Sequence, residues 1–578
     1  MSRRYSSQRR SPSSSAGWAL AALVVGLFAI IGLCCGAYTL VGKLFNRDTT
    51  AGPTPVPEPA TLTVAYSPEK EQAFTELVRR FNDQGLETPD GLRMTVEAVQ
   101  LVPEAMLNAV LTETATFQAM TPDSGLWLGQ LDAGWNQKFG SDAADGQHAA
   151  VVGEMVRYGI SPVVIAMWEG VAREMGWPDR AIGWQDLLAR AQSDPNFRWS
   201  HPSTSSASGM LATLAMFYAG SGKTRGLTIE DAQAQTTLDY VAALEKTVRY
   251  YGEGDEPALI ERALQEGQAS LDAFVVQEQM VVYYNTHRSS GQERLVAIYP
   301  VEGVLWEDHP LTLLETRDLT LPQRQTFARF RDFLLSSESQ QFILSQGYRP
   351  AEASVSLTDP ASPLTTDNGV NPAEPKTALQ VPNAAVVQVV HDVWWYTKRH
   401  TNVYLVVDTS GSMRGEKLDQ AQVALGVFLK EIKGDLERVG MVQFSSNVYN
   451  VIYLDELGDN RQVLQAAIDN LQAGGDTALL DAVSEAFTRL QKEGDPERIN
   501  AIVAMTDGRE NNSSTSLRTL LRRIERESTV PVIVFCIAYG EDADLEMLQS
   551  MAEPTDGQVL QGDPETIRQL YKILSSYF

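Results

Sequence analysis

Cysteine and positive charge are both scarce in this chain of 578 residues. It has three cysteines, of which Cys34 and Cys35 are adjacent in an apolar run and Cys536 stands apart. They make no disulfide framework, so cysteine usage indicates no redox compartment. Lys and Arg number 47 against 73 Asp and Glu, a formal net charge of −26. Such a chain lacks the basic face that neutralises phosphates, which argues against nucleic acid as a partner.

Charged residues are also absent from Ser11 to Gly42, a stretch whose central part, Trp18–Val41, is almost wholly apolar. That length spans a bilayer as a helix and exceeds the apolar region of an ordinary signal peptide. Four arginines precede it without an acidic residue among them, so the short tail should stay in the cytoplasm. They are Arg3, Arg4, Arg9 and Arg10.

The N-terminal part therefore divides into a basic cytoplasmic tail at 1–15, a transmembrane helix at 16–42 and a proline-rich spacer at 43–60. This arrangement predicts a single-pass protein of the cell membrane with the bulk of the chain extracytoplasmic. The alternative is a lipoprotein signal around Cys34 or Cys35. It is disfavoured because the residue before each cysteine is not small.

The remaining length exceeds one hydrophobic core and predicts at least two domains. Thr61–Tyr66 and Arg93–Val99 have strand patterns, and a helical pattern follows each of them. Alternating strands and helices are typical of an α/β fold with a parallel sheet. We place the first domain at 61–382.

Four separated stretches of this region resemble the type II periplasmic solute-binding proteins of ABC import systems. They are the opening strand with its Ser-Pro-Glu cap, His201–Gly209 with the helix after it, Tyr299–Pro310 and Phe333–Pro350. The resemblance implies two lobes joined by crossing strands, with a small solute in the cleft between them. It also implies that Phe274–Val282 is a strand returning to the sheet.

Hydroxyl residues precede two of the predicted helices of this domain. Free N–H groups at a helix start, together with small hydroxyls, favour an anionic ligand. The alternative is that these side chains only cap their helices. The candidate ligand-binding residues are Ser67, Thr204, Ser205, Ser206 and Ser208.

A second chemical motif follows the apolar, β-branched run Val403–Val407, which suits a central strand buried on both faces. Directly after it come Asp408, Ser410 and Ser412. Open α/β sheets place ligands at the carboxyl ends of their strands. Carboxylate and hydroxyl oxygens on a tight loop suit a hard divalent cation, Mg²⁺ in particular.

Asp-x-Ser-x-Ser resembles the metal-ion-dependent adhesion site of von Willebrand factor A domains, and two further segments match that pattern in order. Thr477 follows Gly474-Gly475-Asp476 at a helix start, and Asp507 follows the apolar strand Ile499–Met505. Without this match, the residues would be ordinary turn and cap positions.

The resemblance implies that Ser410 and Ser412 ligate Mg²⁺ directly. Asp408, Thr477 and Asp507 would ligate it directly or through water. Mn²⁺ and Ca²⁺ are alternative ions. A partner protein would complete the coordination with an acidic side chain. The implied activity is binding without a chemical step. These motifs contain no histidine, and nothing beside the site looks like a nucleophile paired with a base.

The rest of the chain supports the same architecture. Val386, Val390 and Trp394 repeat at helical spacing, which predicts a connecting helix within 383–400. Strands and helices alternate over 401–578, which predicts a doubly wound, Rossmann-like domain.

Two functions follow. The first is a membrane-anchored binding or adhesion protein whose two-lobed domain acts as sensor or scaffold. The second is the substrate-binding component of an ABC-type importer whose C-terminal domain mediates assembly. An enzyme is disfavoured.

Overall fold

The computed structural model describes residues 60–571, apart from 141–149, 253–255, 270, 433, 527–528, 541, 556, 565 and 569. The predicted cytoplasmic tail and transmembrane helix, and all but the last residue of the spacer, lie outside these residues. Among the described helices, none has both the length and the apolar character needed to cross a bilayer. By its internal contacts the chain divides into two units, Met1–Glu58 and Pro59–Phe578. Only the second unit is described below.

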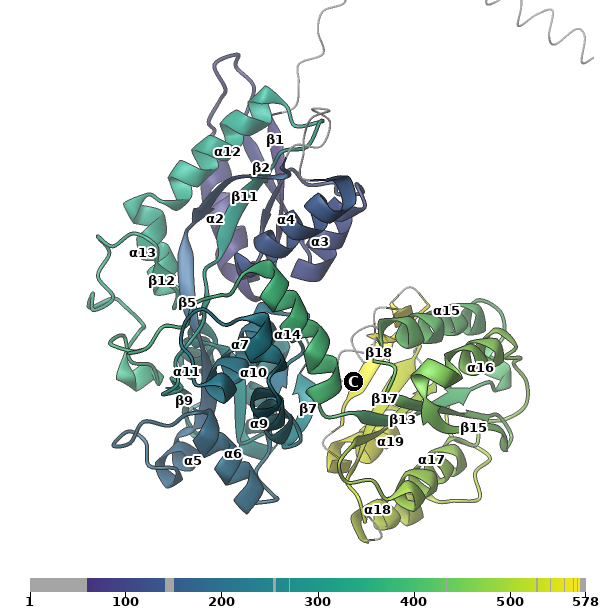
Figure 1. The fold of residues 1–578 in the computed structure, drawn as a ribbon. Coiled ribbons are helices and arrows are strands. Elements are labelled where there is room, and N and C mark those ends of the chain that lie inside the picture. The colour runs from purple at the N-terminus through teal and green to yellow at the C-terminus, as the bar shows by residue number, and fades with distance from the viewer. Residues whose placement is uncertain are drawn as a thin grey trace, which may run out of the picture. The chain divides into compact units, whose positions relative to one another are not determined.

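The first lobe is a five-stranded sheet covered by helices (Figure 1). The strands in spatial order are β2 (Thr95–Gln100), β1 (Thr61–Tyr66), β3 (Ala119–Thr121), β11 (Pro310–Leu314) and β4 (Val152–Arg157). The helices are α2 (Glu71–Asp83), α3 (Pro103–Leu111), α4 (Leu126–Phe139), α12 (Leu321–Leu334) and α13 (Ser337–Ser345). Helix α2 buries Phe74 and Phe81 against Phe330 of α12, as the helical spacing of its apolar residues predicts.

The second lobe is built on the long buried strand β5 (Gly159–Trp168). Its other strands are β6 (Trp199–Pro202), β7 (Val248–Gly252), β8 (Ala273–Gln277), β9 (Leu295–Ile298), β10 (Trp306–Glu307) and β12 (Arg349–Pro350). Its helices are α5 (Glu169–Glu174), α6 (Trp184–Ser193), α7 (Ala207–Ser221), α8 (Ile229–Gln233), α9 (Gln235–Glu245), α10 (Glu256–Glu266) and α11 (Glu278–His287).

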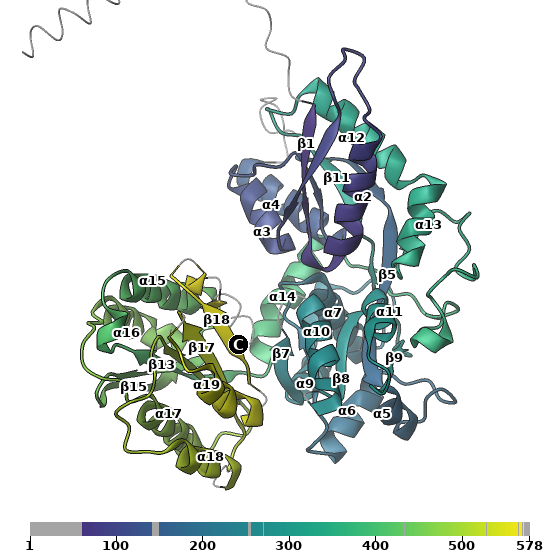
Figure 2. The same cartoon turned by 180° about the vertical axis from the view of Figure 1, so that it is seen from behind.

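Three segments cross between the lobes. Tyr158 joins β4 to β5, Asp308-His309 joins β10 to β11, and residues 346–348 join α13 to β12. Figure 2 shows both lobes from behind, with β5 reaching from one toward the other. The two-lobed arrangement predicted from sequence is therefore present, and the crossing segments bring Asp308 and His309 to the boundary between the lobes.

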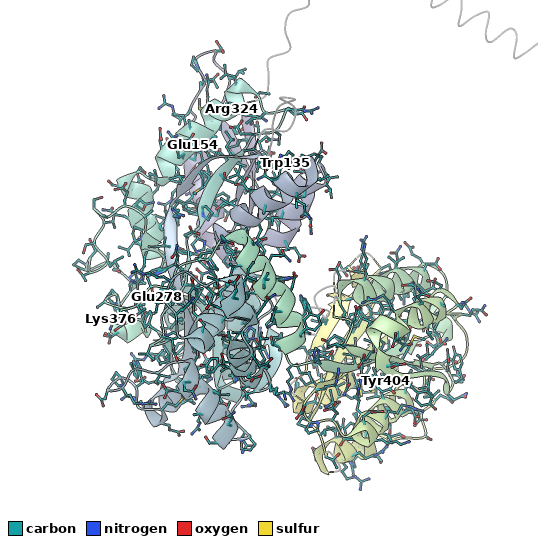
Figure 3. The ribbon with its side chains drawn as sticks, in the orientation of Figure 1. Trp135, Glu154, Glu278, Arg324, Lys376 and Tyr404 are labelled. Atoms are coloured by element: carbon teal, nitrogen blue, oxygen red, sulfur yellow. The ribbon has the colours of Figure 1, made fainter. Side chains whose placement is uncertain are left out.

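The prediction of a continuous strand over Phe274–Val282 is wrong. Strand β8 ends at Gln277, and helix α11 begins at Glu278. A short apolar run does not distinguish a buried strand from a buried helix. Glu278, labelled in Figure 3, lies in the first turn of α11, where it accepts two hydrogen bonds of 2.7 Å from the Arg349 guanidinium. This buried ion pair fixes the start of the helix beside β12.

The predicted connecting helix is α14 (Ala384–Thr397), capped by Asn383, whose Oδ1 accepts from the Val386 amide at 3.1 Å. It lies against α7, α8 and α9 of the second lobe and against α4 of the first. Trp394 donates its indole N–H to the buried carboxylate of Glu245 at 2.8 Å. On the first lobe, the Gln130 amide donates to the Ala384 carbonyl at 3.3 Å. Helix α14 therefore touches both lobes and is anchored most firmly on the second.

The C-terminal part is a six-stranded sheet with helices on both faces. Its strand order is β15 (Val448–Glu456), β14 (Arg438–Phe444), β13 (Thr401–Asp408), β16 (Ile499–Thr506), β17 (Val532–Tyr539) and β18 (Val559–Gly562). All neighbours pair in parallel except β14 and β15. The helices are α15 (Glu416–Glu431), α16 (Leu457–Asp469), α17 (Leu479–Glu493), α18 (Leu517–Arg526) and α19 (Leu545–Ala552).

Strand β13 is central and every residue in it is buried. Val403, Leu405 and Val407 pack on the side of α15 and α16, whereas Tyr404 and Val406 pack on the side of α17, α18 and α19. This two-sided burial is the doubly wound arrangement that the sequence predicts. The predicted closing helix Pro564–Tyr577 lies largely outside the described residues.

At the amino end of the same sheet, a buried carboxylate holds together residues at the start of β13. Glu437 lies 3.0 Å from the Lys398 ammonium, and its other oxygen accepts two hydrogen bonds of 2.6 Å from Thr401. Burial alone would raise the pKa of Glu437. The Lys398 charge and the hydrogen bonds from His400 and Thr401 outweigh it and lower the pKa to about 2.

We predict that Glu437→Gln destabilises the protein by about 3–5 kcal/mol at pH 7, because the variant leaves the Lys398 charge buried without its partner. Since the pKa of Glu437 is depressed in the folded state, its contribution to stability is present at pH values above the ordinary pKa of glutamate. This contribution is lost as the pH falls through about 2. Urea unfolding followed by tryptophan fluorescence at pH 7 and pH 3 measures it.

The control is Glu485→Gln, which removes a surface pair with Arg489 on one helix and should change stability by less than about 0.5 kcal/mol. Equal effects of the two substitutions at pH 7 would show that the buried pair does not hold the sheet.

Candidate functional site

Three loops meet at the carboxyl edge of the C-terminal sheet, and we call the place the sheet-edge site. It comprises Asp408, Ser410, Ser412, Thr477 and Asp507. Strands β13 and β16 run parallel and in register, so Asp408 and Asp507 emerge at the same edge. Two backbone hydrogen bonds join the first loop to the loop before α17. Gly411 donates to Gly475 at 2.9 Å, and Gly474 donates to Thr409 at 2.8 Å.

The predicted side chains lie together at this edge. The hydroxyls of Ser410 and Ser412 are 3.0 Å apart, and Ser412 donates to Asp507 at 2.6 Å. Asp408 accepts a hydrogen bond of 2.7 Å from the backbone N–H of Ser410. A β-carbon on Gly508 would lie 3.5 Å from Ser412 Oγ and 3.7 Å from Thr477 Oγ1, so all three loops contribute oxygens to one small volume.

The carboxylates of the site are buried, and little positive charge lies beside them to neutralise them. Burial raises the pKa of Asp408 to about 6, and the neighbouring Asp507 adds to the rise, against hydrogen bonds from Thr506 and Ser410 that lower it. The fully buried Asp507 accepts from the Lys417 ammonium at 2.6 Å. Lys417 therefore compensates Asp507, whereas Asp408 is held by hydrogen bonds from Thr506 and Ser410.

Backbone geometry holds the Thr477 loop in place. Gly475 has a φ of +88°, and a β-carbon there would come within 2.6 Å of Ser446 Oγ. The Thr477 amide donates to Asn511 Oδ1 at 2.9 Å. Asn511 follows Asp507 in the same loop, so the loops after β13 and β16 and the one before α17 constrain one another.

The donor set suits a hard divalent cation, because it offers three hydroxyls and two carboxylates and no nitrogen or sulfur. No cluster of three or more His, Cys, Asp or Glu suited to a metal occurs among the described residues. A metal at this edge would therefore depend on the serine and threonine oxygens.

In the two-lobed domain, the five predicted ligand-binding residues separate into three environments. Ser206 caps α7 by accepting from the Gly209 amide at 3.1 Å, as the alternative prediction has it. Ser67 and Ser208 are buried and donate to carboxylates, Ser67 to Glu69 at 2.7 Å and Ser208 to Glu307 at 2.6 Å. Thr204 and Ser205 line a pocket between the lobes.

Sequence reasoning missed the charged group between the lobes, which we call the acid cluster. Its carboxylates come from both lobes, and Lys70 of the first lobe and His309 of a crossing segment lie among them. One feature of the sequence could have indicated this cluster. Glu307 and His309 lie within Tyr299–Pro310, one of the stretches that resemble solute-binding proteins. The acidic members are Glu69, Asp123, Glu256 and Glu307.

Burial raises the pKa of three of these acids, Asp123, Glu256 and Glu307. The pKa of Asp123 rises to about 7 and that of Glu256 to about 8, and that of Glu307 lies well above its ordinary value through burial and the charge of Glu256. Burial and the Lys70 charge push the pKa of His309 well below its usual range. Glu307 Oε2 and His309 Nδ1 are buried without hydrogen-bond partners. The cluster therefore holds protons in the folded chain.

We predict that the parent chain loses stability from pH 5 to pH 8 and that Glu307→Gln loses less. A buried acid with a raised pKa stabilises the fold below its ordinary pKa, and this contribution is lost as pH rises toward the folded-state value. Each such group changes the free energy of unfolding by about 1.4 kcal/mol per pH unit. Chemical unfolding at several pH values measures the slope.

Glu97→Gln is the matched control, because Glu97 is exposed on β2. Its pH slope should equal that of the parent. A parent slope retained in Glu307→Gln would mean that this carboxyl is already ionised in the folded chain.

Comparison with known proteins adds family relationships to this geometry. Residues 62–349 match the family of bacterial extracellular solute-binding proteins, and residues 402–572 match the von Willebrand factor type A domain. Inter-alpha-trypsin inhibitor heavy chain H4 of Sus scrofa is 24% identical over 281 residues, which are 46% of this chain and 29% of that protein. The chain thus spans less than a third of that relative's length.

Two solved structures resemble separate parts of the chain. A von Willebrand factor type A protein from Catenulispora acidiphila is 22% identical with a TM-score of 0.28, covering 31% of this chain and 42% of that one. Iron-bound HitA from Pseudomonas aeruginosa is 16% identical with a TM-score of 0.39, covering 58% of this chain and 99% of that one.

Both matched families are binding domains rather than enzyme families, and an extracellular solute-binding domain indicates an extracytoplasmic location. Residues 62–349 form a bacterial solute-binding domain, and residues 402–572 form a von Willebrand factor type A domain.

Proposed function

We propose that this protein is a membrane-anchored extracytoplasmic binding or adhesion protein that uses Mg²⁺ at the sheet-edge site to bind a carboxylate of a partner protein. The convergence of five oxygen-bearing side chains from three mutually bonded loops carries this proposal. The ion would supply positive charge and a coordination position for the partner's acidic residue.

Each residue of the site has a distinct task in this proposal. Ser410 and Ser412 would hold the ion directly, and Thr477, Asp408 and Asp507 directly or through water. The N–H of Ser410 and the hydroxyl of Thr506 donate to the Asp408 carboxylate at 2.7 and 2.5 Å and so orient it. Mn²⁺ or Ca²⁺ could take the same oxygen set, since both accept carboxylate and hydroxyl ligands.

The solute-binding domain acts in this proposal as a sensor or scaffold for a small solute. The supporting observation is a pocket of about 250 Å³ that both lobes line. The same pocket favours a second candidate function, in which the domain delivers solute to an ABC-type permease and the C-terminal domain mediates assembly. Uptake of labelled solute that depends on this chain in cells would favour the second function.

We predict that Asp408→Ala abolishes stabilisation by Mg²⁺. Ligand binding to the folded state adds about 2.7 kcal/mol at a concentration one hundred times the Kd. The parent chain should therefore gain thermal stability in millimolar Mg²⁺, and the variant should not. Thermal unfolding and isothermal titration with MgCl₂ measure both effects.

Asp469→Ala is the matched control, since Asp469 is exposed at the end of α16. It should respond to Mg²⁺ as the parent does. If Asp408→Ala bound Mg²⁺ as tightly as the parent, the sheet-edge site would not be the metal site.

We predict that Lys417→Gln is less stable than the parent without metal and gains more stability from Mg²⁺. The Lys417 ammonium lies 2.6 Å from Asp507 and forms an ion pair with this buried carboxylate. Removing it leaves the acid uncompensated, and a divalent ion then relieves a larger penalty. Thermal unfolding with EDTA and with MgCl₂ gives the two differences. An Mg²⁺ gain equal to the parent's would show that the lysine and the ion do not serve the same carboxylate.

A further inference from the structure

The acid cluster lies where the two lobes meet. The first lobe contributes Glu69 and Asp123, and the second contributes Glu256 and Glu307. A hydrogen bond joins the lobes directly at this place, because the Asp123 carboxylate accepts from the Ala207 amide of α7 at 3.1 Å. The lobes therefore cannot separate without taking these groups apart.

The geometry of two of the acids requires a shared proton. Ser208 Oγ lies 2.6 Å from Glu307 Oε1 and also makes a short hydrogen bond with Glu256 Oε1. A serine hydroxyl has one hydrogen and donates to only one of these two oxygens. The other oxygen must then belong to a protonated carboxyl group that donates to Ser208. The pair Glu256 and Glu307 therefore carries at least one proton in this arrangement of the lobes.

Two buried atoms of the cluster have no hydrogen-bond partner in the described part of the chain. They are Glu307 Oε2 and His309 Nδ1. His309 Nε2 lies 3.2 Å from Gln277 Oε1, so it carries the hydrogen of a neutral ring and donates to this oxygen. An ionised Glu307 would have a buried, unpartnered oxygen, which costs more than the same position in a neutral carboxyl group. The contacts of Glu307 thus fit its protonated form.

The charges around Glu307 are mainly negative. Burial raises its pKa most, and the neighbouring carboxylates raise it further. The Lys70 ammonium belongs to the first lobe, where it donates to two backbone carbonyls and lies 3.4 Å from Glu69. The titratable groups that face one another here are Glu69, Lys70, Asp123, Tyr158, Glu256, Glu307, His309 and Tyr348. Two acids beside them are paired with arginines, Asp308 with Arg157 and Glu278 with Arg349.

One of the crossing segments bends at the cluster. His309 has a φ of +30°, in the left-handed region that residues other than glycine seldom adopt. Its amide donates to the Asp123 carbonyl at 3.1 Å, and its ring packs edge-on against Tyr348 with 4.9 Å between the centroids. Backbone strain of this kind persists only where the surroundings hold it, and it is typical of segments that switch. The crossing therefore couples movement of the lobes to the charge of the cluster.

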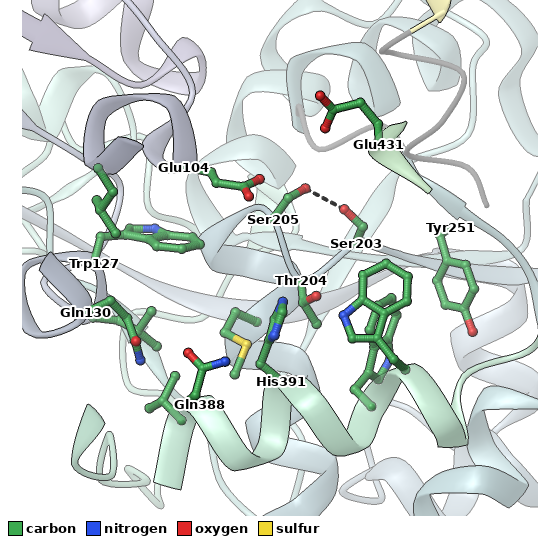
Figure 4. Close-up of a pocket in the computed structure, with 16 residues that line it drawn as sticks. Glu104, Trp127, Gln130, Ser203, Thr204, Ser205, Tyr251, Gln388, His391 and Glu431 are labelled. Carbon is green, nitrogen blue, oxygen red and sulfur yellow. Dashed lines mark hydrogen bonds between the residues drawn. The ribbon is translucent and has the colours of Figure 1, made fainter. Parts of the chain in front are cut away.

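The acid cluster also borders the pocket that both lobes line. Trp127 donates its indole N–H to Asp123 at 2.8 Å and lines this pocket together with Thr204. Figure 4 shows Trp127 of the first lobe and Thr204 of the second among the residues that line it. Separation of the lobes at the cluster would therefore also part the walls of the pocket.

We propose that closing of the lobes takes up protons at the acid cluster, so that the two-lobed domain is closed at mildly acidic pH and opens as the pH rises. In the closed arrangement the carboxyl groups are out of water and next to one another, whereas in an open arrangement water would surround them. This inference goes beyond the proposed function, since it requires neither Mg²⁺ nor a particular solute.

The direction of the effect follows from linkage. The closed form has acids with raised pKa values, about 7 for Asp123 and about 8 for Glu256, and therefore binds more protons than the open form. Its advantage is complete below the ordinary carboxyl pKa of about 4 and is lost as the pH rises through the raised values. Over this range the ratio of closed to open chains should fall about tenfold per pH unit for each proton taken up.

Spin labels on both lobes of the full chain test this inference by double electron–electron resonance. Exposed positions on α2 and α10 carry them, through Thr75→Cys and Gln265→Cys. Cys34→Ala and Cys35→Ala remove two native thiols, and the third, Cys536, is buried. A short distance should dominate at pH 5.5, and a longer one should replace it toward pH 9. A distribution that stays unchanged, or that lengthens as the pH falls, overturns the inference.

Two substitutions locate the protons. Glu307→Gln cannot ionise and keeps the shape of a protonated carboxyl group, so its ratio of short to long distances should fall about tenfold less per pH unit than that of the parent. Glu256→Gln should act in the same direction and serves if the first variant does not fold. Glu97→Gln, exposed on β2, is the matched control and should follow the parent. A pH profile like that of the parent in both buried variants contradicts the inference.

The same samples, measured with EDTA and titrated with MgCl₂, separate this inference from the proposed function. A distance that changes with pH in a chain that does not bind Mg²⁺ refutes the metal site and leaves the inference intact. A chain that binds Mg²⁺ but shows one distance at every pH refutes the inference alone.

Discussion

Burial of β13 on both faces is the constraint on which the C-terminal domain depends. A strand with helices on either side has no polar face, so its hydrogen-bonding side chains gather at its two ends. At the amino end, Thr401 meets Glu437 and Lys398. At the carboxyl end, Asp408 stands in the same low-dielectric surroundings with weaker compensation, and its pKa is raised where that of Glu437 is lowered. One end is a completed ion pair, and the other is a set of oxygens that a cation would complete.

The acid cluster of the two-lobed domain follows the same physics with a different result. Its carboxylates come from both lobes, so they are close together only because the lobes face one another. The neutral forms of Asp123, Glu256 and Glu307 are favoured there, because burial raises the pKa of each. The arrangement of the lobes in this structure therefore favours protonated carboxyl groups between them.

Helix α14 belongs to the solute-binding side by its contacts and leads into β13 by its sequence. Its Trp394 is fixed by Glu245, a buried carboxylate that also accepts from Tyr251 at 2.8 Å. Tyr251 in turn accepts from the Arg399 amide at 2.6 Å. The backbone just before β13 is thus held by the same residues that anchor α14.

Much of this organisation could be predicted from the sequence, and the reasons are local. The run Val403–Val407 has the composition of a buried strand, and the loop motifs that carry Asp408, Thr477 and Asp507 each follow from a few adjacent residues. The meeting of Asp408 and Asp507 at one edge follows from parallel pairing. The helix over Ala384–Thr397 was equally predictable, because its apolar residues repeat at helical spacing and Asn383 caps it.

Only the tertiary structure decided the rest. Phe274–Val282 is strand and then helix, because apolarity alone suits either element and Arg349, distant in sequence, fixes Glu278 at the boundary. Ser208 donates to Glu307, which lies 99 residues further along the chain, so its role could not be read from neighbouring residues. A single sequence determines local conformation through neighbouring residues, whereas the charge of a cleft is set by groups that meet only when the lobes come together.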